Sequence, residues 1–311
     1  MSGHGIRLAA ILAAAALAAA CSTAPGRHPA PSATALPGAG ATPTASATPG
    51  AVASTPRTQP SNPYPDHVLI VVFENKAFSQ LDGSGRAPYL NALMARSAVY
   101  TDFHAETHPS QPNYIALFSG DTHGVTSDSC PVRLHGTPNL GRQLLDTGRT
   151  FAGYSEAMPG PGYTGCAAGR YAAKHNPWVD FDNVPATANQ PASAMPSDYA
   201  ALPTVSFLIP DLCNDMHDCP ISTGDAWARA HLEPYVQWAR AHNSALVVTF
   251  DEDDGSENNR ILTLISGART TPGRYGVAAT HYGLLATVEA WYGLARLGRA
   301  AAATPLPKAW G

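Results

Sequence analysis

Acidic and amide side chains directly follow three apolar segments of this 311-residue chain. Long β-branched apolar runs are typical of strands buried in a parallel sheet. Because ligands of such sheets bind beyond the carboxyl ends of the strands, we expect these side chains to share one crevice. Oxygen ligands without thiolates favour a hard or borderline divalent cation, whose usual partner is an anionic oxygen substrate such as phosphate. The side chains are Glu74 and Asn75 after 67–73, Asp211 after 204–209, and Asp251 and Glu252 after 245–250.

Ser110 is the candidate nucleophile. It precedes Gln111 and Pro112, and a proline near the first turn favours the start of a helix. A hydroxyl at that point lies beside unpaired backbone N–H groups and the positive end of the helix dipole, which together bind phosphate. A plain capping serine is common at the same position, so Ser110 alone does not establish an active site.

Strands and helices alternate along the part of the chain that would position these residues. Helical spacing predicts helices, of which the fourth contains Pro234 and is expected to bend or split there. This order predicts an α/β fold in a single domain, a parallel-rich sheet sandwiched by helices. The strands are expected at 67–73, 98–103, 150–154, 204–209, 245–250 and 261–265, and the helices at 87–96, 112–118, 140–147, 225–242 and 281–292.

The first 66 residues are expected to lie outside that domain, which would span 67–311. Residues 1–21 are typical of an export signal, because Arg7 precedes an apolar run that is shorter than the ~20 residues needed to span a bilayer. The run ends at Cys21 in a sequence that resembles a bacterial lipobox, in which the cysteine is acylated; an ordinary signal peptide is the alternative. Residues 22–66, rich in Pro, Ala, Ser and Thr, predict a disordered linker. We therefore expect an exported protein, either secreted or associated with a membrane through acylated Cys21.

Composition limits the partners and the compartment. With a formal net charge of −4 and only 14% charged residues, the chain lacks the basic face of a nucleic-acid binder. An even number of cysteines beyond Cys21 suggests two disulfides in an exported protein. Three pairings can be drawn, and we favour Cys213–Cys219 with Cys130–Cys166. A thiolate metal site is disfavoured because the sequence has no CxxC pair.

The polar motifs, taken in order, resemble the phosphoesterase family that contains bacterial phospholipases C and secreted acid phosphatases. The likeness is strongest to bacterial secreted acid phosphatases that act on phosphatidylinositol 3-phosphate, and it extends over essentially all of 67–311. It implies the fold of the alkaline-phosphatase-like superfamily. The motifs are Glu74-Asn75, His108-Pro-Ser110-Gln-Pro-Asn-Tyr114, Lys174-His175, Asn214-Asp215-Met-His217-Asp218, Gly224-Asp225, residues 248–255 and His281-Tyr282.

The resemblance implies a metal site beside the nucleophile Ser110. Contact with the metal would lower the pKa of the serine hydroxyl and neutralise charge on the transferred phosphoryl group. One divalent ion is expected rather than two, because relatives with two metals carry an aspartate-histidine pair where this chain has Asp251-Glu252. Asp211 stands where a ligand of a second metal would be. The implied ligands are Glu74, Asn75, Asp251 and Glu252.

Histidines are implied as contacts of the phosphate. His217 and His281 would serve as hydrogen-bond donors or as the proton donor to the leaving alcohol, with His108 and His175 as further contacts. A protonated imidazole suits this task at mildly acidic pH. His104 is expected to be structural or exposed, because Pro109 argues against a helix that would pair it with His108. Gly283 stands where many relatives have a serine next to the His-Tyr motif.

The expected function is that of an exported, metal-dependent and monomeric acid phosphatase. It would hydrolyse phosphomonoesters, phosphatidylinositol 3-phosphate among the candidates, through a phosphoserine intermediate on Ser110. One alternative is a phospholipase C-type phosphodiesterase, for which the chain is short. Another is a non-catalytic surface lipoprotein that binds a phosphorylated ligand, although none of the strand-end acids is lost.

Overall fold

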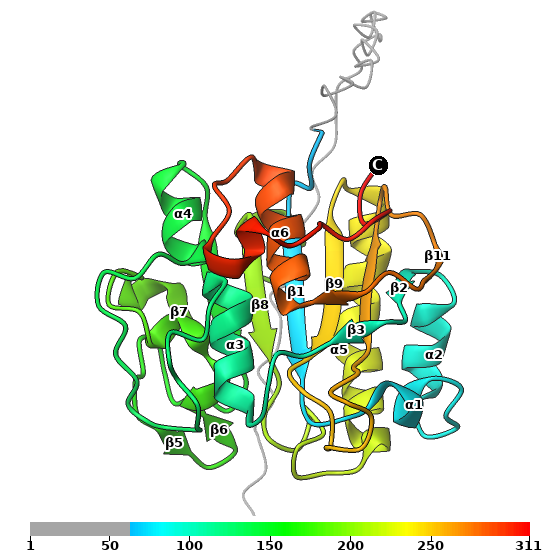
Figure 1. Cartoon of the computed structure of the whole chain (residues 1–311), viewed down its shortest axis with the longest axis horizontal. Helices are drawn as coiled ribbons and strands as arrows, with labels where there is room; N and C mark the ends of the chain where they lie inside the picture. Colours follow the sequence, from blue (N-terminus) through cyan, green and yellow to red (C-terminus); the bar gives the residue numbers. More distant parts are fainter. Residues whose placement is uncertain (1–62) are drawn as a thin grey trace, which may run out of the picture. The chain divides into compact units, whose positions relative to one another are not determined.

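An eight-stranded sheet is the centre of the computed structural model, which describes residues 63–311 (Figure 1). The sheet has the order β11-β2-β10-β9-β1-β8-β4-β7, and two short two-stranded sheets, β12-β3 and β5-β6, lie outside it. The strands are β1 (Val68–Phe73), β2 (Ala98–Tyr100), β3 (Phe103–His104), β4 (Phe151–Ser155), β5 (Ala167–Ala168), β6 (Tyr171–Ala172), β7 (Asn189–Pro191), β8 (Val205–Ile209), β9 (Ala245–Phe250), β10 (Thr263–Gly267), β11 (Gly273–Tyr275) and β12 (Ala279–Thr280).

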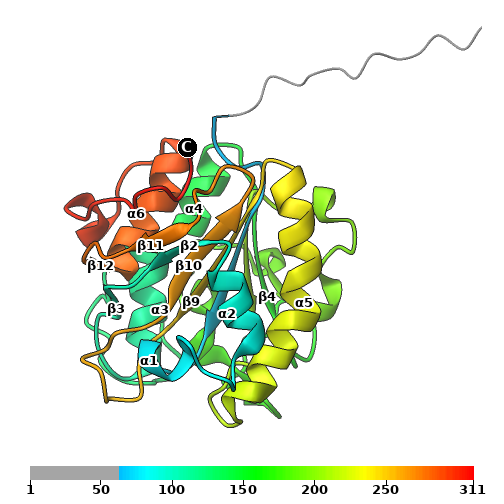
Figure 2. The same ribbon diagram turned by 90° about the vertical axis from the view of Figure 1, so that its right-hand side faces the viewer.

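Helices cover both faces of the sheet (Figure 2), as the alternation of elements predicts. Helices α3, α4 and α6 lie on one face, whereas α1, α2 and α5 lie on the other. The α-helices are α1 (Phe78–Leu81), α2 (Pro88–Met94), α3 (Ser110–Ser119), α4 (Leu140–Asp146), α5 (Ile221–Ala241) and α6 (His281–Tyr292). The 3₁₀ turns are η1 (Ala173–His175), η2 (Pro177–Val179), η3 (Ala186–Ala188), η4 (Ala192–Ala194), η5 (Tyr199–Ala201) and η6 (Gly298–Ala301).

The middle of the sheet is parallel, and one strand departs from the expected direction. β1 pairs in parallel with β8 and β9, and every residue of β1 and β9 is buried. β10 is antiparallel to both of its neighbours, β9 and β2. The reason is the connection 251–262, which contains no helix. Without a helical crossover the chain does not return to the edge from which a parallel partner must start.

Local signals in the sequence account for several helix ends. Asn139 caps α4, because its side chain accepts a hydrogen bond from the Arg142 amide at 2.8 Å. Gly120 ends α3 with a left-handed φ of 79°, and a Cβ there would lie 2.3 Å from the Leu297 carbonyl oxygen. Helix α5 begins before residue 225 and runs through Pro234 without splitting. Its buried face, which includes Leu232 and Val236, holds it together despite the lost backbone hydrogen bond.

Both favoured disulfides, Cys130–Cys166 and Cys213–Cys219, are present. The expected export signal, Cys21 and residues 22–62 lie outside the described residues. Pro63 to Asp66 pack on the domain: the rings of Tyr64 and Tyr292 lie 5.5 Å apart, and the Tyr292 hydroxyl donates to the Pro65 carbonyl at 3.1 Å. Among the described helices, none is long and apolar enough to cross a membrane.

Glu289 is a charged side chain enclosed by α6 and the C-terminal segment. It is fully buried, it accepts a hydrogen bond from the Leu297 amide at 2.9 Å, and its nearest cation is the Arg296 guanidinium at 4.0 Å. Burial raises the pKa of this carboxyl to about 7. The native state therefore holds a proton on Glu289 at pH values at which the unfolded chain has released it.

Glu289→Gln is expected to change the pH dependence of stability. Between the pKa of a free glutamate and about 7, the native protein binds more protons, so its free energy of unfolding falls as pH rises. For this one group the slope reaches up to about 1.4 kcal/mol per pH unit. Urea unfolding at pH 4.5 and at pH 7.5 measures this change. The free energy of unfolding of Glu289→Gln, relative to that of the wild type, should be larger at pH 7.5 than at pH 4.5. If the stability of both proteins changed by the same amount between the two pH values, the raised pKa of Glu289 would be contradicted.

Candidate active site

Ser110 is the first residue of α3, and its hydroxyl lies between two carboxylates. Its Oγ is 3.1 Å from Glu74 Oε2 and 3.0 Å from Glu252 Oε1, and all three side chains are buried. A hydroxyl has one proton, so it donates to one of these oxygens at a time. The second contact requires either a protonated carboxyl or a cation that draws all three oxygens together.

The parallel pairing of β1 with β9 brings the predicted metal ligands to one place. The register sets Phe73 beside Phe250, so Glu74 and Asp251 leave the sheet side by side. The amide of Asn75, which has a left-handed φ of 51°, donates to Asp251 Oδ1 at 3.0 Å. Glu252 follows on the same loop and reaches Ser110. Glu74, Asp251, Glu252 and the implied nucleophile thus form one cluster, to which Asn75 contributes its backbone N–H.

The carboxylates of this cluster share a buried environment. Burial, followed by the charges of Asp251 and Asp215, raises the pKa of Glu74 well above its usual range. Burial likewise raises the pKa of Asp251, and that of Glu252 to about 7. Desolvated acids so close together cannot all ionise without a compensating positive charge.

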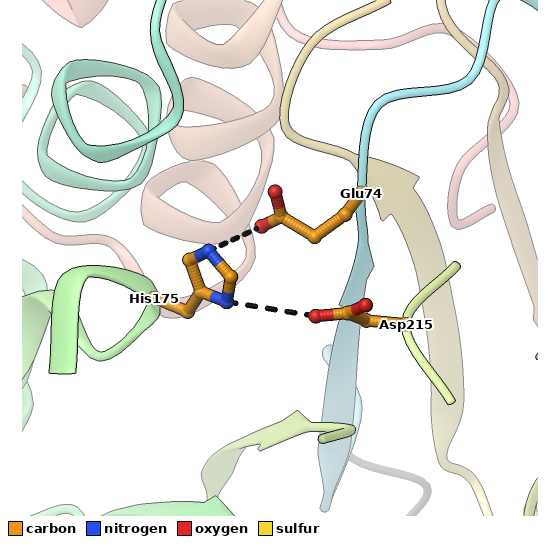
Figure 3. Close-up of side chains that lie close together, drawn as sticks. All are labelled: Glu74, His175 and Asp215. Atoms are coloured by element: carbon orange, nitrogen blue, oxygen red, sulfur yellow. Dashed lines mark ion pairs between the residues drawn. The ribbon is translucent and has the colours of Figure 1, made fainter. Parts of the chain in front are cut away.

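Several atoms of the cluster fit a cation. Among the described residues, Asp251 Oδ2, Asp215 Oδ2 and His175 Nε2 are buried polar atoms without a hydrogen-bond partner. One ligand atom each of Glu74, His175 and Asp215 lies within 4.8 Å of the others (Figure 3). Buried polar atoms are normally paired, so this set of oxygen and nitrogen donors suits a divalent metal ion.

Two of the predicted histidines belong to the cluster. The buried His175 ring stacks on Tyr114 with ring centres 5.2 Å apart, and its Nε2 lies 3.2 Å from Glu74 Oε1. Burial lowers the pKa of His175 well below its usual value, so the ring is neutral. His108 contacts Glu252 through Nδ1 and keeps 47% of its side chain exposed, at the mouth of the site.

The other two lie at its borders. His217 is exposed, its ring centre is 6.1 Å from that of His175, and its Nδ1 is 2.7 Å from Asp218. His281 is buried and its Nε2 donates to the Asp251 carbonyl at 2.9 Å, so it supports the ligand loop from behind. Burial lowers the pKa of His281 to about 4, which keeps the ring neutral in the mildly acidic range.

Two further predicted residues lie away from Ser110. Asp211 Oδ1 accepts the amides of Cys213 and Asn214, and so stabilises the loop after β8. His104 binds Asp102 and the Asn258 carbonyl, which agrees with its expected structural role.

The chain matches the Phosphoesterase family over residues 83–295. It is 50% identical over 247 residues to a phosphatidylinositol-3-phosphatase of Mycobacterium tuberculosis, with 79% of this chain and 83% of that protein covered. The chain belongs to the Phosphoesterase family. An acid phosphatase of Aspergillus fumigatus is 32% identical, with 67% of this chain but only 51% of that protein covered. The expectation of an enzyme that hydrolyses phosphoric esters is confirmed.

Solved structures show the same fold. A protein of the alkaline phosphatase superfamily from Vibrio parahaemolyticus superimposes with a TM-score of 0.54 at 15% identity, covering 78% of this chain and 71% of that one. A phosphonate monoester hydrolase from Silicibacter pomeroyi gives a TM-score of 0.51 at 13% identity, covering 78% of this chain and 76% of that one. The alkaline-phosphatase-like fold implied by the motifs is therefore confirmed for this phosphoesterase.

Two residues of the cluster were not among the predicted site residues. Tyr114 donates its hydroxyl to Glu74 Oε1, and Asp215 faces His175 with its Oδ2. Tyr114 is four residues after Ser110 on the same helix, a spacing that puts both side chains on one face and gives a signal in the sequence. Asp215 belongs to the motif Asn214-Asp215-Met-His217-Asp218, but its place beside His175 depends on how the loop between β8 and α5 folds.

Cation binding is expected to stabilise this phosphoesterase, and Asp251→Asn should remove most of the effect. The variant keeps an acceptor for the Asn75 amide but loses the negative charge. A cation at one hundred times its dissociation constant raises the free energy of unfolding by about 2.7 kcal/mol. Melting temperatures recorded with Mg²⁺, Mn²⁺ or Ca²⁺, and again with a chelator, measure this stabilisation. Asp254→Asn is the matched control, because this exposed neighbour binds Gln80 and Ser256 rather than Ser110. Equal responses of the two variants would argue against the site.

Proposed function

We propose that the protein is a metal-dependent acid phosphatase that hydrolyses phosphomonoesters through a phosphoserine on Ser110. The observation that carries the proposal is the position of Ser110 Oγ, which lies at the start of α3 and within 3.1 Å of two buried carboxylates. The helix start turns the positive end of its dipole toward the phosphoryl oxygens, although the Gln111 N–H already donates to Asp128 Oδ1 at 3.0 Å and Pro112 has no N–H. One divalent metal ion held by Glu74, Asn75, Asp251 and Glu252 would supply charge neutralisation for the phosphoryl group and the serine oxygen.

The side chains around Ser110 have separate tasks. Glu252 takes the hydroxyl proton as the Ser110 Oγ–phosphorus bond forms and the bond from phosphorus to the leaving alcohol breaks. Of the four histidines predicted for the site, His108 and His217 have side chains that reach solvent, so either can give the alcohol its proton. Water then cleaves the phosphoserine and releases inorganic phosphate. His281 contributes by holding the Asp251 backbone.

The relatives support a class of substrate, and the disulfides support a location. The phosphatidylinositol-3-phosphatase at 50% identity supports phosphatidylinositol 3-phosphate, and the fungal acid phosphatases support phosphomonoesters in general. The chain spans about half the length of those fungal relatives. Two disulfides support export, after which the protein is secreted or held at a membrane surface through an acylated Cys21.

Ser110→Ala is expected to lower the rate of p-nitrophenyl phosphate hydrolysis by at least about a thousandfold, because no other hydroxyl takes the place of the nucleophile. Ser119→Ala is the matched control. Ser119 lies at the other end of α3, is also buried, and donates to the Ile115 carbonyl at 2.7 Å. The Ser119→Ala variant therefore shows how much activity and stability are lost when a buried hydroxyl of α3 that is not the nucleophile is removed. Substantial activity in Ser110→Ala, with an unchanged melting temperature, would remove Ser110 from its role.

Phosphate release from lipid vesicles tests the substrate. Vesicles of phosphatidylcholine that contain phosphatidylinositol 3-phosphate should give inorganic phosphate at a higher kcat/KM than vesicles with the 4-phosphate isomer. A general phosphomonoesterase would hydrolyse both isomers and p-nitrophenyl phosphate at similar rates. Diacylglycerol released from phosphatidylcholine would instead indicate a phosphodiesterase.

A further inference from the structure

The His175 ring lies between two buried carboxylates and hydrogen-bonds well to neither. Its Nε2 is 3.2 Å from Glu74 Oε1 and its Nδ1 is 3.6 Å from Asp215 Oδ2 (Figure 3). Among the described residues Nε2 has no hydrogen-bond partner, and neither has Asp215 Oδ2. A neutral imidazole carries one N–H and one lone pair, so it can donate a hydrogen bond to only one of the two carboxyl groups.

The surroundings of each carboxylate favour one tautomer. Glu74 Oε1 already accepts the Tyr114 hydroxyl, and Glu74 Oε2 lies at Ser110 Oγ. Asp215 Oδ1 accepts the His217 amide at 2.7 Å, which leaves Oδ2 open toward the ring. A proton on Nδ1 therefore finds an open acceptor, and the Nε2 lone pair then faces Glu74 on the side of the proposed metal ion.

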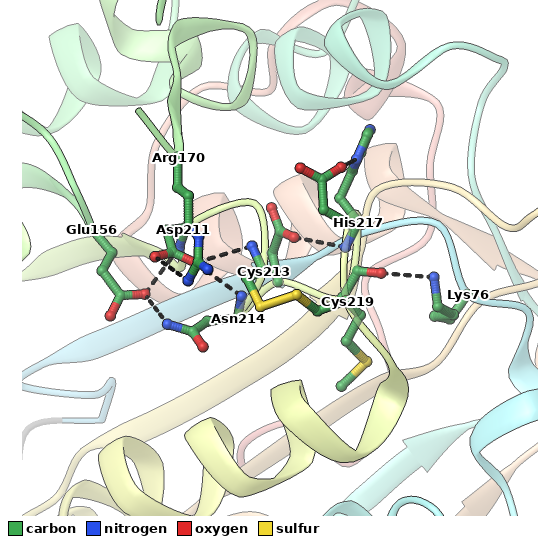
Figure 4. Close-up of a disulfide and its surroundings, with 11 residues drawn as sticks. Lys76, Glu156, Arg170, Asp211, Cys213, Asn214, His217 and Cys219 are labelled. Carbon is green, nitrogen blue, oxygen red and sulfur yellow. Dashed lines mark hydrogen bonds and ion pairs between the residues drawn. A yellow bond between two sulfur atoms is a disulfide. The ribbon is translucent and has the colours of Figure 1, made fainter. Parts of the chain in front are cut away.

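The Cys213–Cys219 disulfide closes residues 213–219 into a loop (Figure 4). Asp215 lies within this loop, and backbone hydrogen bonds fix its place. The Asp215 amide donates to the Asp211 carbonyl, and the Asp215 carbonyl accepts the Glu74 amide, both at 2.8 Å. Lys76 donates to the Met216 carbonyl at 2.9 Å. The loop is thus tied to the end of β1, the strand that supplies Glu74.

The same loop contains a costly backbone conformation. Met216 has a φ of 80°, which is unfavourable for a residue with a Cβ. Its side chain is fully buried against Gly224, where a Cβ would lie 2.4 Å from Met216 Cγ. Such a conformation persists only where the surroundings enforce it, and the Cys213–Cys219 disulfide encloses it.

We propose that Asp215 is a positioning residue for the active site rather than a ligand of the metal ion: its Oδ2 accepts a hydrogen bond from Nδ1–H of His175 and so turns the Nε2 lone pair toward the metal ion. The loop closed by Cys213–Cys219 holds Asp215 in that position. The arrangement follows the general rule that a carboxylate orients a metal-binding histidine through its second ring nitrogen. This inference rests on the proposed function, because it requires a cation beside Glu74.

Asp215→Asn tests the tautomer directly. Since the His217 amide binds Oδ1, the NH₂ group of the new side chain would face His175 and donate to Nδ1. In the cation-free protein, at a pH at which the Asp215 carboxyl is ionised, ¹⁵N chemical shifts of the His175 ring should show Nδ1–H in the wild type and Nε2–H in the variant. The affinity for Mg²⁺ or Mn²⁺, measured by calorimetry, should fall at least about tenfold. Asp218→Asn, in the same loop but bound to His217, should change neither quantity.

The disulfide gives a second and independent test. Cys213→Ser with Cys219→Ser is expected to lower the cation affinity, whereas Cys130→Ser with Cys166→Ser is the matched control and should leave it unchanged. An Nε2–H tautomer in the wild type, or equal cation affinity in wild type and Asp215→Asn, would overturn the inference. If the serine pair lowers stability, Asp215→Asn decides, because it keeps the backbone contacts. A wild-type chain that binds no cation would contradict the proposed function itself. An active Ser110→Ala variant would contradict the role of Ser110 but would leave the proposed role of Asp215 unchanged.

Discussion

The repulsion among buried carboxylates at the ends of β1 and β9 is the constraint on which the site depends. Glu74, Asp251 and Glu252 are each nearly inaccessible to water, and burial raises the pKa of all three. Charges in such a place cost several kcal/mol each unless an opposite charge compensates them. Tyr114, the amide of Asn75 and the hydroxyl of Ser110 give hydrogen bonds but no positive charge. Protonation of a carboxyl or a bound cation can compensate these charges, and the proposed metal ion would meet this electrostatic demand as well as that of the chemistry.

The rest of the fold keeps these acids from moving apart. The parallel register of β1 and β9 fixes where their side chains leave the sheet, and the hydrophobic residues on both faces make a slip of that register costly. Helix α3 brings Ser110 and Tyr114 to the cluster on one face. His281 holds the Asp251 backbone from α6, and the disulfide loop holds Asp215. The cluster is therefore supported by segments from most of the described chain.

Much of this arrangement can be predicted from the sequence because it depends on local patterns. Apolar runs mark β1, β8 and β9, and the residues that follow each run are found where parallel strands end. Asp211 shows the limit of that reasoning: it follows β8, yet its side chain is used to stabilise its own loop. Asp215 shows the converse: it comes later in the same loop than Asp211, yet it is the residue that reaches His175, because a disulfide and a left-handed Met216 shape the loop. The direction of β10 depends on the absence of a crossover helix, which apolar periodicity alone does not reveal.

The packing of Tyr64 on Tyr292 has a consequence for how the protein meets its surroundings. The chain joins the domain beside the amino end of β1, whereas Glu74 lies past the carboxyl end of the same strand. The reactive edge and the point of attachment are thus at opposite poles of the sheet. The segment that enters the domain at Tyr64 therefore does not cover the catalytic edge, and this edge stays open to phosphoesters that approach from the other end of the sheet.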